Sequence, residues 1–93
     1  MILVLRRWFV PSERLDEFIG RWRDEIEPMI VKQPGCVRAE VYQSSIRGHW
    51  VTSVVWADEA SRMKALAALA GLYNEFRQYE RFEPEVLTSV ETP

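Results

Sequence analysis

The sequence has few of the residues from which disulfides, metal sites and phosphate-binding loops are built. It contains one cysteine, Cys36, and one histidine, His49. A lone cysteine excludes an internal disulfide and fits a reducing compartment, so we expect a cytoplasmic protein. A lone histidine provides no His pair at metal-ligand spacing, and neither a CxxC motif nor a glycine-rich phosphate loop occurs. We therefore expect no bound metal and no cofactor.

An excess of positive charge and long apolar runs are also missing. Twelve Lys and Arg residues stand against fourteen Asp and Glu, a formal net charge of −2, which does not favour a nucleic-acid partner. The longest apolar run, residues 65–72, is far shorter than the roughly 20 residues of a membrane-spanning helix. Residues 2–5, which precede two arginines, are too few for a signal peptide. We expect no nucleic-acid partner and no membrane association.

The composition that remains is that of one globular domain. The 93 residues are 47% hydrophobic and 28% charged, which is an ordinary balance for a folded protein. A second hydrophobic core would leave each half too small to be stable alone. Residues 1–93 are therefore expected to form a single domain.

The hydrophobic pattern of the first half predicts a strand, a helix and a second strand. Residues 2–10 are apolar on both faces except at two arginines, as in a strand buried on both sides. A one-sided apolar stripe predicts the helix that follows, with Ser12 as its cap, a kink at Pro28 and an end at residues 34–35. Residues 36–42 alternate between apolar and polar, which is typical of a strand at a sheet edge.

The second half repeats this order of elements. A hairpin loop that pivots at Gly48 leads into residues 50–56, a second strand with two apolar faces. Asp58 is expected to cap a second helix that is interrupted at Gly71 and closed by Glu83-Pro84. Residues 85–90 are expected to form the last strand. The residues predicted to face inward on the second helix are Met63, Leu66, Ala67 and Ala70.

Two β-α-β units joined by a hairpin predict an α+β, ferredoxin-like split β-α-β fold. Right-handed crossovers place the first and third strands in the middle of a four-stranded antiparallel sheet, with both helices on one face. The opposite face would then expose leucine and valine from several strands, more than a monomer normally leaves in water. We therefore expect a homodimer in which two copies pack sheet against sheet.

Several segments, spread over nearly the whole chain, together resemble one known family. They are Ile2-Leu3-Val4, Phe9-Val10-Pro11, Glu17-Phe18, Trp22, Pro28, Gln33-Pro34-Gly35-Cys36 and Val55-Trp56-Ala57-Asp58-Glu59-Ala60. With these segments the chain resembles the antibiotic-biosynthesis monooxygenase (ABM) family of dimeric α/β barrels. This resemblance implies a homodimer with a pocket in each subunit, between the sheet and the helices. Members include oxygenases that use no metal or flavin on phenolic or quinol substrates, and others that bind and degrade haem.

The haem-degrading branch of the family fits the sequence less well. Those relatives use a histidine on the second helix to bind the iron and carry a tryptophan on the same helix. Residues 60–82 contain neither residue type. Without the axial ligand, haem degradation is the less favoured activity.

Cofactor-free oxygenation needs an apolar pocket, a base, and a positive or hydrogen-bonding group beside the developing anion. Arg6 and His49 are the catalytic candidates. Arg6, on the first strand, could hold a substrate anion; alternatively it forms a salt bridge to Glu40 or to a helix carboxylate. His49 is the only side chain with an ordinary pKa near neutrality, but beside Gly48 it could equally be an exposed, idle imidazole.

Four further residues are candidates for substrate binding. Trp56 is expected to stack on an aromatic ligand or, alternatively, to anchor the core between strand and helix. Tyr42, Tyr73 and Asn74 could donate hydrogen bonds to a substrate oxygen, although Tyr73 could also pack with its hydroxyl in water. These residues indicate a cofactor-independent monooxygenase acting on a small aromatic, quinol or polyketide-like substrate. The alternative is a non-catalytic dimeric module that binds a small hydrophobic ligand or a partner protein.

Overall fold

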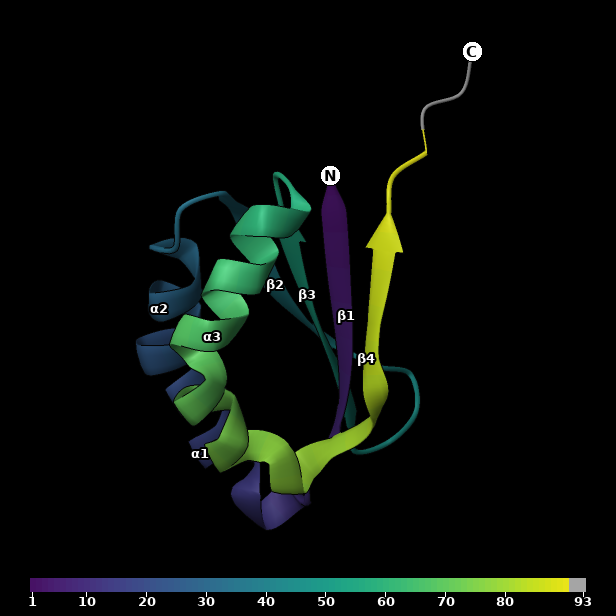
Figure 1. Ribbon diagram of the computed structural model, residues 1–93. Helices are drawn as coiled ribbons and strands as arrows, with labels where there is room; N and C mark the ends of the chain where they lie inside the picture. The colour runs from purple at the N-terminus through teal and green to yellow at the C-terminus, as the bar shows by residue number, and fades with distance from the viewer. Residues whose placement is uncertain (91–93) are drawn as a thin grey trace.

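Four strands form one antiparallel sheet in the order β2-β3-β1-β4 (Figure 1). The computed structural model describes residues 1–90. The expectation that the first and third strands lie in the middle of the sheet is confirmed. The strands are β1 (Ile2–Phe9), β2 (Cys36–Gln43), β3 (His49–Trp56) and β4 (Glu80–Thr88).

All helical segments lie on one face of the sheet, and the opposite face carries no helix (Figure 1). This confirms the predicted ferredoxin-like α+β fold. No helix in the described part of the chain has the length and apolar character needed to cross a membrane. The helical segments are a 3₁₀ turn (Ser12–Arg14), α1 (Leu15–Arg21), a π-helical turn (Trp22–Ile26), α2 (Glu27–Val31), α3 (Glu59–Phe76) and a second 3₁₀ turn (Arg77–Tyr79).

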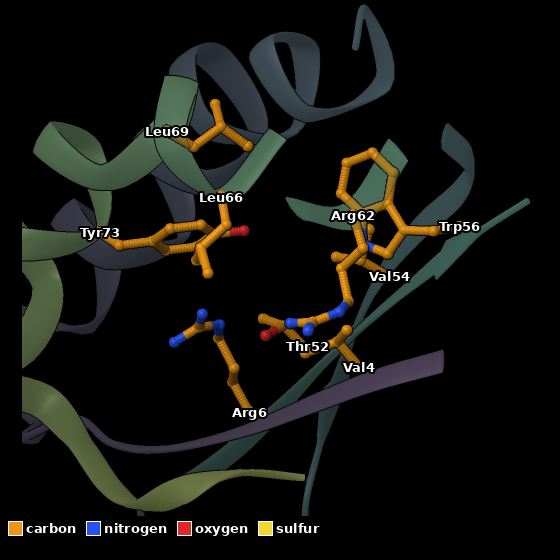
Figure 2. A pocket seen from close by; sticks show the side chains of 9 residues that line it. All are labelled: Val4, Arg6, Thr52, Val54, Trp56, Arg62, Leu66, Leu69 and Tyr73. Carbon is orange, nitrogen blue, oxygen red and sulfur yellow. The ribbon is translucent and has the colours of Figure 1, made fainter. Parts of the chain in front are cut away.

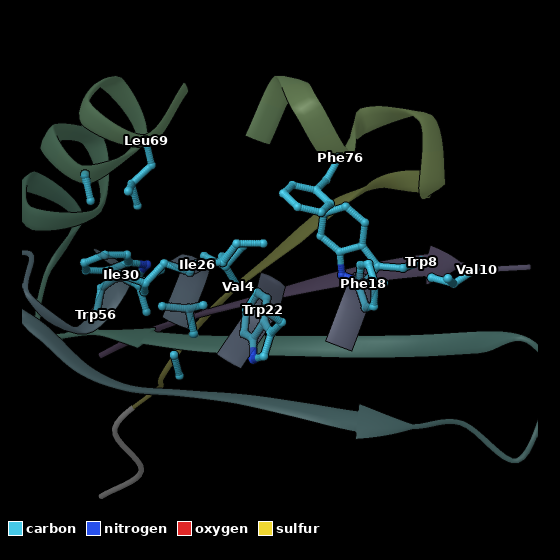
Figure 3. Close-up of a cluster of buried hydrophobic side chains, with 14 residues drawn as sticks. Val4, Trp8, Val10, Phe18, Trp22, Ile26, Ile30, Trp56, Leu69 and Phe76 are labelled. Atoms are coloured by element: carbon cyan, nitrogen blue, oxygen red, sulfur yellow. The ribbon is translucent and has the colours of Figure 1, made fainter. Parts of the chain in front are cut away.

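The core lies between the helices and one face of β1 and β3. Side chains alternate along a strand, and the antiparallel register joins residues of one face: Val4 lies opposite Val54, and Trp8 opposite Trp50. Figure 3 shows the aromatic part of the core, in which the Phe18 ring packs against Trp8 and Phe76 with ring centroids 5.9 and 6.1 Å away. These contacts tie α1 and α3 to the sheet.

The predictions made for the helix ends and for Pro28 are confirmed in part. The carboxylate of Asp58 accepts a hydrogen bond from the Ser61 backbone N–H at 2.8 Å and so caps α3 as predicted. Pro28 has no N–H to donate, and the regular helix gives way to a π-helical turn just before it, as the predicted kink requires. The prediction for Ser12 is wrong, because the chain enters a 3₁₀ turn after Pro11 and no side chain caps it.

The predicted inward face of α3 is wrong for most of its residues. Met63 is 51% exposed, Ala67 and Ala70 are also exposed, and the helix continues through Gly71 without a break. The buried residues are Ala65, Leu69 and Phe76, in a stripe that also includes Leu72 and Tyr73. This stripe carries two aromatic rings and two leucines, so burying it removes more apolar area from water than burying the predicted stripe, half of which is alanine. A glycine in a helix interior lowers helix stability by only about 1 kcal/mol, and the tertiary packing of α3 outweighs this cost at Gly71.

The last strand begins five residues earlier than predicted. β4 starts at Glu80 and contains Pro84, which is tolerated because β4 is an edge strand and one side of it makes no ladder hydrogen bonds. Its register with β1 passes from Leu5 opposite Glu85 to Arg7 opposite Arg81, so residues 82–84 bulge opposite the single residue between them. That single residue is Arg6, and the bulge shapes its surroundings.

Candidate functional site

A narrow pocket of about 20 Å³ lies between α3 and the strands β1 and β3 (Figure 2). It continues into a wider depression along β4, which Glu80 and the bulged residues 82–84 help to line. The inner pocket is apolar except for two arginines, a threonine and a tyrosine. Its lining residues are Val4, Arg6, Thr52, Val54, Trp56, Arg62, Leu66, Leu69 and Tyr73.

The regular spacing of strand and helix brings these side chains together. On the sheet side, Arg6 lies opposite Thr52 in the register of β1 and β3, so both point toward the helices. On the helix side, Arg62, Leu69 and Tyr73 are separated by seven and four residues, which places them on one face of α3. The pocket is therefore enclosed by one face of the sheet and one face of α3.

Arg6 is the most constrained polar group of the pocket. Its side chain is 14% exposed, and its Nη1 lies 2.8 Å from Oε2 of Glu80. Its guanidinium also stacks over the Tyr73 ring, with Cζ 4.2 Å from the ring centroid. The expected salt bridge to Glu40 is wrong, because Glu40 lies on the strand β2 and pairs with Arg38 at 3.0 Å. The salt-bridge partner of Arg6 is instead Glu80 on β4, and its carboxylate balances the positive charge of the partly buried guanidinium.

Two hydroxyl groups complete the polar part of the pocket. Burial raises the pKa of Tyr73 above the ordinary tyrosine value, so its phenol is neutral near pH 7 and can donate a hydrogen bond. Its ring extends from α3 into the pocket (Figure 2). Thr52 accepts a hydrogen bond from the indole N–H of Trp8 at 3.0 Å, which leaves its own O–H available as a donor.

Of the predicted site residues, the structure brings Arg6, Trp56 and Tyr73 together. Trp56 is 3% exposed and lies at one end of the pocket, beside Val54 (Figure 2). It belongs to the core cluster and to the pocket wall at once. The two roles considered for Trp56, core anchor and pocket wall, are thus compatible, because one side of its indole packs in the core and the other side borders the pocket.

The other three candidates lie outside the pocket. His49 packs edge-on against Phe9, with ring centroids 5.5 Å apart, and Phe9 alternates with the buried Trp8 on β1. The hydroxyl of Tyr42 donates to the Glu40 carboxylate on β2, and that hydrogen bond raises the pKa of Tyr42. Asn74 is exposed on α3 and lines neither the pocket nor its mouth. None of these side chains is placed to act on a molecule in this pocket.

Arg62 and Thr52 are the polar lining residues that were not predicted from the sequence. Arg62, Ala65, Leu69, Leu72 and Phe76 follow the spacing of one helix face, but the predicted stripe of Met63, Leu66, Ala67 and Ala70 does so as well. Assigning α3 by the first of these stripes would have placed Arg62 over the sheet. The described residues contain no group of three His, Cys, Asp or Glu side chains arranged as metal ligands.

Comparisons with known proteins identify the family. A family model described as antibiotic biosynthesis monooxygenase matches residues 1–71, whereas no curated protein matches the sequence. A crystal structure of an antibiotic biosynthesis monooxygenase has a TM-score of 0.77 and 21% identity, covering 100% of both chains. SnoaB, a cofactor-independent oxygenase from Streptomyces nogalater, has a TM-score of 0.73 and 19% identity over 98% of this chain and 94% of its own.

A third similar structure is HapK from Hahella chejuensis, with a TM-score of 0.76 and 17% identity over 100% of this chain and 96% of its own. At these identities the structural matches establish the shared fold. The family model covers the first strand, the first helix, the hairpin and most of α3. The chain therefore belongs to the antibiotic biosynthesis monooxygenase family.

Proposed function

We propose that this protein is a cofactor-independent monooxygenase acting on a small aromatic, quinol or polyketide-like molecule. The molecule is held in the depression of about 520 Å³ along β4, with its reacting end at the narrow pocket between α3 and the sheet. The observation that carries the proposal is Arg6. Its guanidinium, 14% exposed, borders an apolar pocket and stacks on Tyr73. A cation in such a place stabilises an anion far better than it would in water. SnoaB, which shares the fold, is described as a cofactor-independent oxygenase.

The proposed reaction uses the substrate itself as the reductant. A phenol or enol loses a proton, and the resulting anion transfers an electron to oxygen; the two radicals then join through a new C–O bond. Cleavage of the O–O bond leaves one oxygen on the substrate as a carbonyl and releases the other as water. For a ring CH₂ group the balance is CH₂ plus O₂ giving C=O plus H₂O, with all four electrons supplied by the substrate.

The pocket residues have distinct roles in this scheme. Arg6 stabilises the substrate anion, and the neutral phenol of Tyr73 and the hydroxyl of Thr52 donate hydrogen bonds to its oxygens. The apolar side chains between the sheet and α3 exclude water, which strengthens these interactions. None of the nine lining residues is a histidine or a carboxylate. The proton is therefore taken at the mouth, where Glu80 lies 2.8 Å from Arg6.

The first prediction is oxygen uptake by the purified, metal-free protein. With 1,8-dihydroxyanthrone, whose ring CH₂ is acidic because its anion is conjugated through the rings to the ketone, we expect one O₂ consumed per anthraquinone formed. An oxygen electrode and absorbance spectroscopy measure the two quantities, and a peroxide assay should detect no hydrogen peroxide. Heat-denatured protein corrects for the spontaneous reaction.

Uptake no faster than that of the denatured control, across anthrones, naphthols and quinols, would contradict catalysis. If the same compounds raise the melting temperature without being converted, the alternative of a non-catalytic ligand-binding module is favoured. The absence of a histidine or carboxylate among the lining residues is the observation that keeps this alternative in view.

The proposal includes a homodimer formed by the uncovered face of the sheet. The side chains of Leu3, Val55 and Leu87 are neighbours there, because β3, β1 and β4 align them side by side. Leu87 is 40% exposed and Phe9, farther along the same face, is 37% exposed. A second copy packed on this face removes that apolar surface from water.

The second prediction concerns this dimer. At micromolar concentration, sedimentation should give twice the chain mass of 10.9 kDa, and Leu3→Glu should give single chains because it places a charge among apolar partners. Met63→Glu is the matched control, since Met63 is 51% exposed on α3, across the molecule from that face. A wild-type protein that sediments as a single chain would rule out the dimer.

A further inference from the structure

The inner pocket contains an imbalance of charge. Two of its nine lining side chains are guanidinium groups, those of Arg6 and Arg62, and none is a carboxylate. Their partners, Glu80 and Glu59, are not among the lining residues of the inner pocket. A ligand that extends from the wider depression into this pocket meets both arginines, while the carboxylates of Glu80 and Glu83 line the depression only.

Arg62 has the geometry of a binding group as well as that of a helix-surface ion pair. Its Nε and Nη2 donate to the two carboxylate oxygens of Glu59 at 3.0 and 2.6 Å, and Nη2 also contacts the sulfur of Met63 at 3.4 Å. Within residues 1–90 its Nη1 has no hydrogen-bond partner. The Arg62 side chain is 19% exposed, whereas that of Glu59 is 56% exposed.

The ion pair with Glu59 does not by itself require the Arg62 side chain to be this buried. An i, i+3 pair on a helix surface contributes only a few tenths of a kcal/mol and forms equally well in solvent. Here the Arg62 side chain instead reaches across the pocket toward Thr52 and Val4, on the sheet side (Figure 2). Glu59 and Met63 engage Nε and Nη2 of the guanidinium, so Nη1 is the nitrogen that a ligand in the pocket can use.

We infer that Arg62 is a specificity-determining residue that binds a carboxylate substituent on an aromatic ligand. The inference rests on the proposed function for the identity of the site. Arg6 faces the ring oxygen that becomes anionic during the reaction, whereas Arg62 binds a group that is anionic throughout. The Nη1 group of Arg62 can donate a charge-assisted hydrogen bond to a carboxylate oxygen. The preferred substrates are therefore hydroxylated aromatic acids rather than their neutral analogues.

Binding of two matched probes tests this inference without any turnover. The probes are 2-naphthoate and its neutral analogue 2-naphthamide, measured by isothermal titration calorimetry at pH 7. Wild-type protein should bind the naphthoate about 10- to 100-fold more tightly, as expected for a charge-assisted hydrogen-bonded pair in a partly enclosed site. Equal affinities in the wild-type protein overturn the inference, whatever the variants do.

The variants then assign the preference to one residue. Arg62→Gln should abolish the preference for naphthoate while leaving the affinity for naphthamide within about twofold. Arg23→Gln, which removes the same charge from an exposed position that lines neither the pocket nor its mouth, should keep the preference. A preference retained in Arg62→Gln overturns the inference. Melting curves report whether each variant is folded, and Arg62→Lys, which keeps the charge, serves if the glutamine variant is not.

The outcomes of the two proposals remain separate. If the protein prefers naphthoate through Arg62 but consumes no oxygen, the binding role of Arg62 is supported and the proposed catalysis is contradicted. A protein that oxidises the anthrone but binds both naphthalene probes equally retains the catalysis and loses the role of Arg62.

Discussion

Replacing Arg6 by glutamine is expected to lower the oxygen-dependent turnover number by about 100- to 1000-fold, the loss that follows removal of one preorganised group from a developing anion. Glutamine preserves part of the volume and one donor, but it has no charge to stabilise the phenolate or enolate. The rate is measured with 1,8-dihydroxyanthrone at saturating concentration. The loss should therefore appear in kcat rather than in KM alone.

Two further variants distinguish this effect from a folding defect. Arg6→Gln leaves the Glu80 carboxylate, 14% exposed, without its partner, and an unpaired, partly buried charge destabilises the fold. The double change of Arg6→Gln and Glu80→Gln removes both charges, so it should restore the melting temperature and show that the unpaired carboxylate causes the loss of stability. Its turnover stays low in any case, because Glu80, the proposed base, is also removed. Arg6→Lys should retain intermediate activity, because it keeps the charge but loses the planar stacking on Tyr73. A turnover number within a few-fold of wild type in Arg6→Gln would contradict the proposed role.

Truncation of Trp22 is expected to cause the largest loss of stability. Its side chain is 2% exposed and packs in the core beside Phe18 and Ile26 (Figure 3). Trp22→Ala should lower the free energy of unfolding by about 3–5 kcal/mol, through lost apolar burial and the cavity left behind. Urea unfolding followed by circular dichroism measures the change, at one fixed protein concentration because a dimer's stability depends on it.

Trp22→Phe is the informative control for that prediction. The indole Nε1 of Trp22 is buried and has no hydrogen-bond partner among the described residues. Phenylalanine removes this unsatisfied donor while keeping most of the aromatic volume, so its cost should be well below that of alanine. If both variants lose the same free energy, the indole contributes through a polar contact rather than through packing.

The sheet was predictable because its signal is local. Residues 2–10 and 50–56 are apolar on both faces, and residues 36–42 alternate; in the structure the first two segments are the central strands and the third is an edge. Each pattern depends only on the period of two along a strand. The chain order and the handedness of the crossovers then leave one arrangement.

The face of α3 that packs against the sheet was not predictable in the same way. Residues 65–72 are almost all small or apolar, so the helix has no single hydrophobic stripe that its own sequence marks as inward. Packing against Phe18 and Trp22 selects the face that carries Leu69 and Phe76. The same packing places Arg62 in the pocket lining, and for this reason Arg62 was not predicted as a site residue.

The sequence by itself determined the order of the strands, the single layer of helices, the capping of α3 by Asp58 and the choice of Arg6 as an unusual charge in an apolar strand. Only the tertiary structure decided what surrounds that charge. Glu80 lies 74 positions away along the chain and reaches Arg6 through the bulged pairing of β4, and His49 faces away because it is opposite Phe9 in the register. Local periodicity specifies which face a residue belongs to within its own element, but the partners it meets there depend on pairing between distant segments.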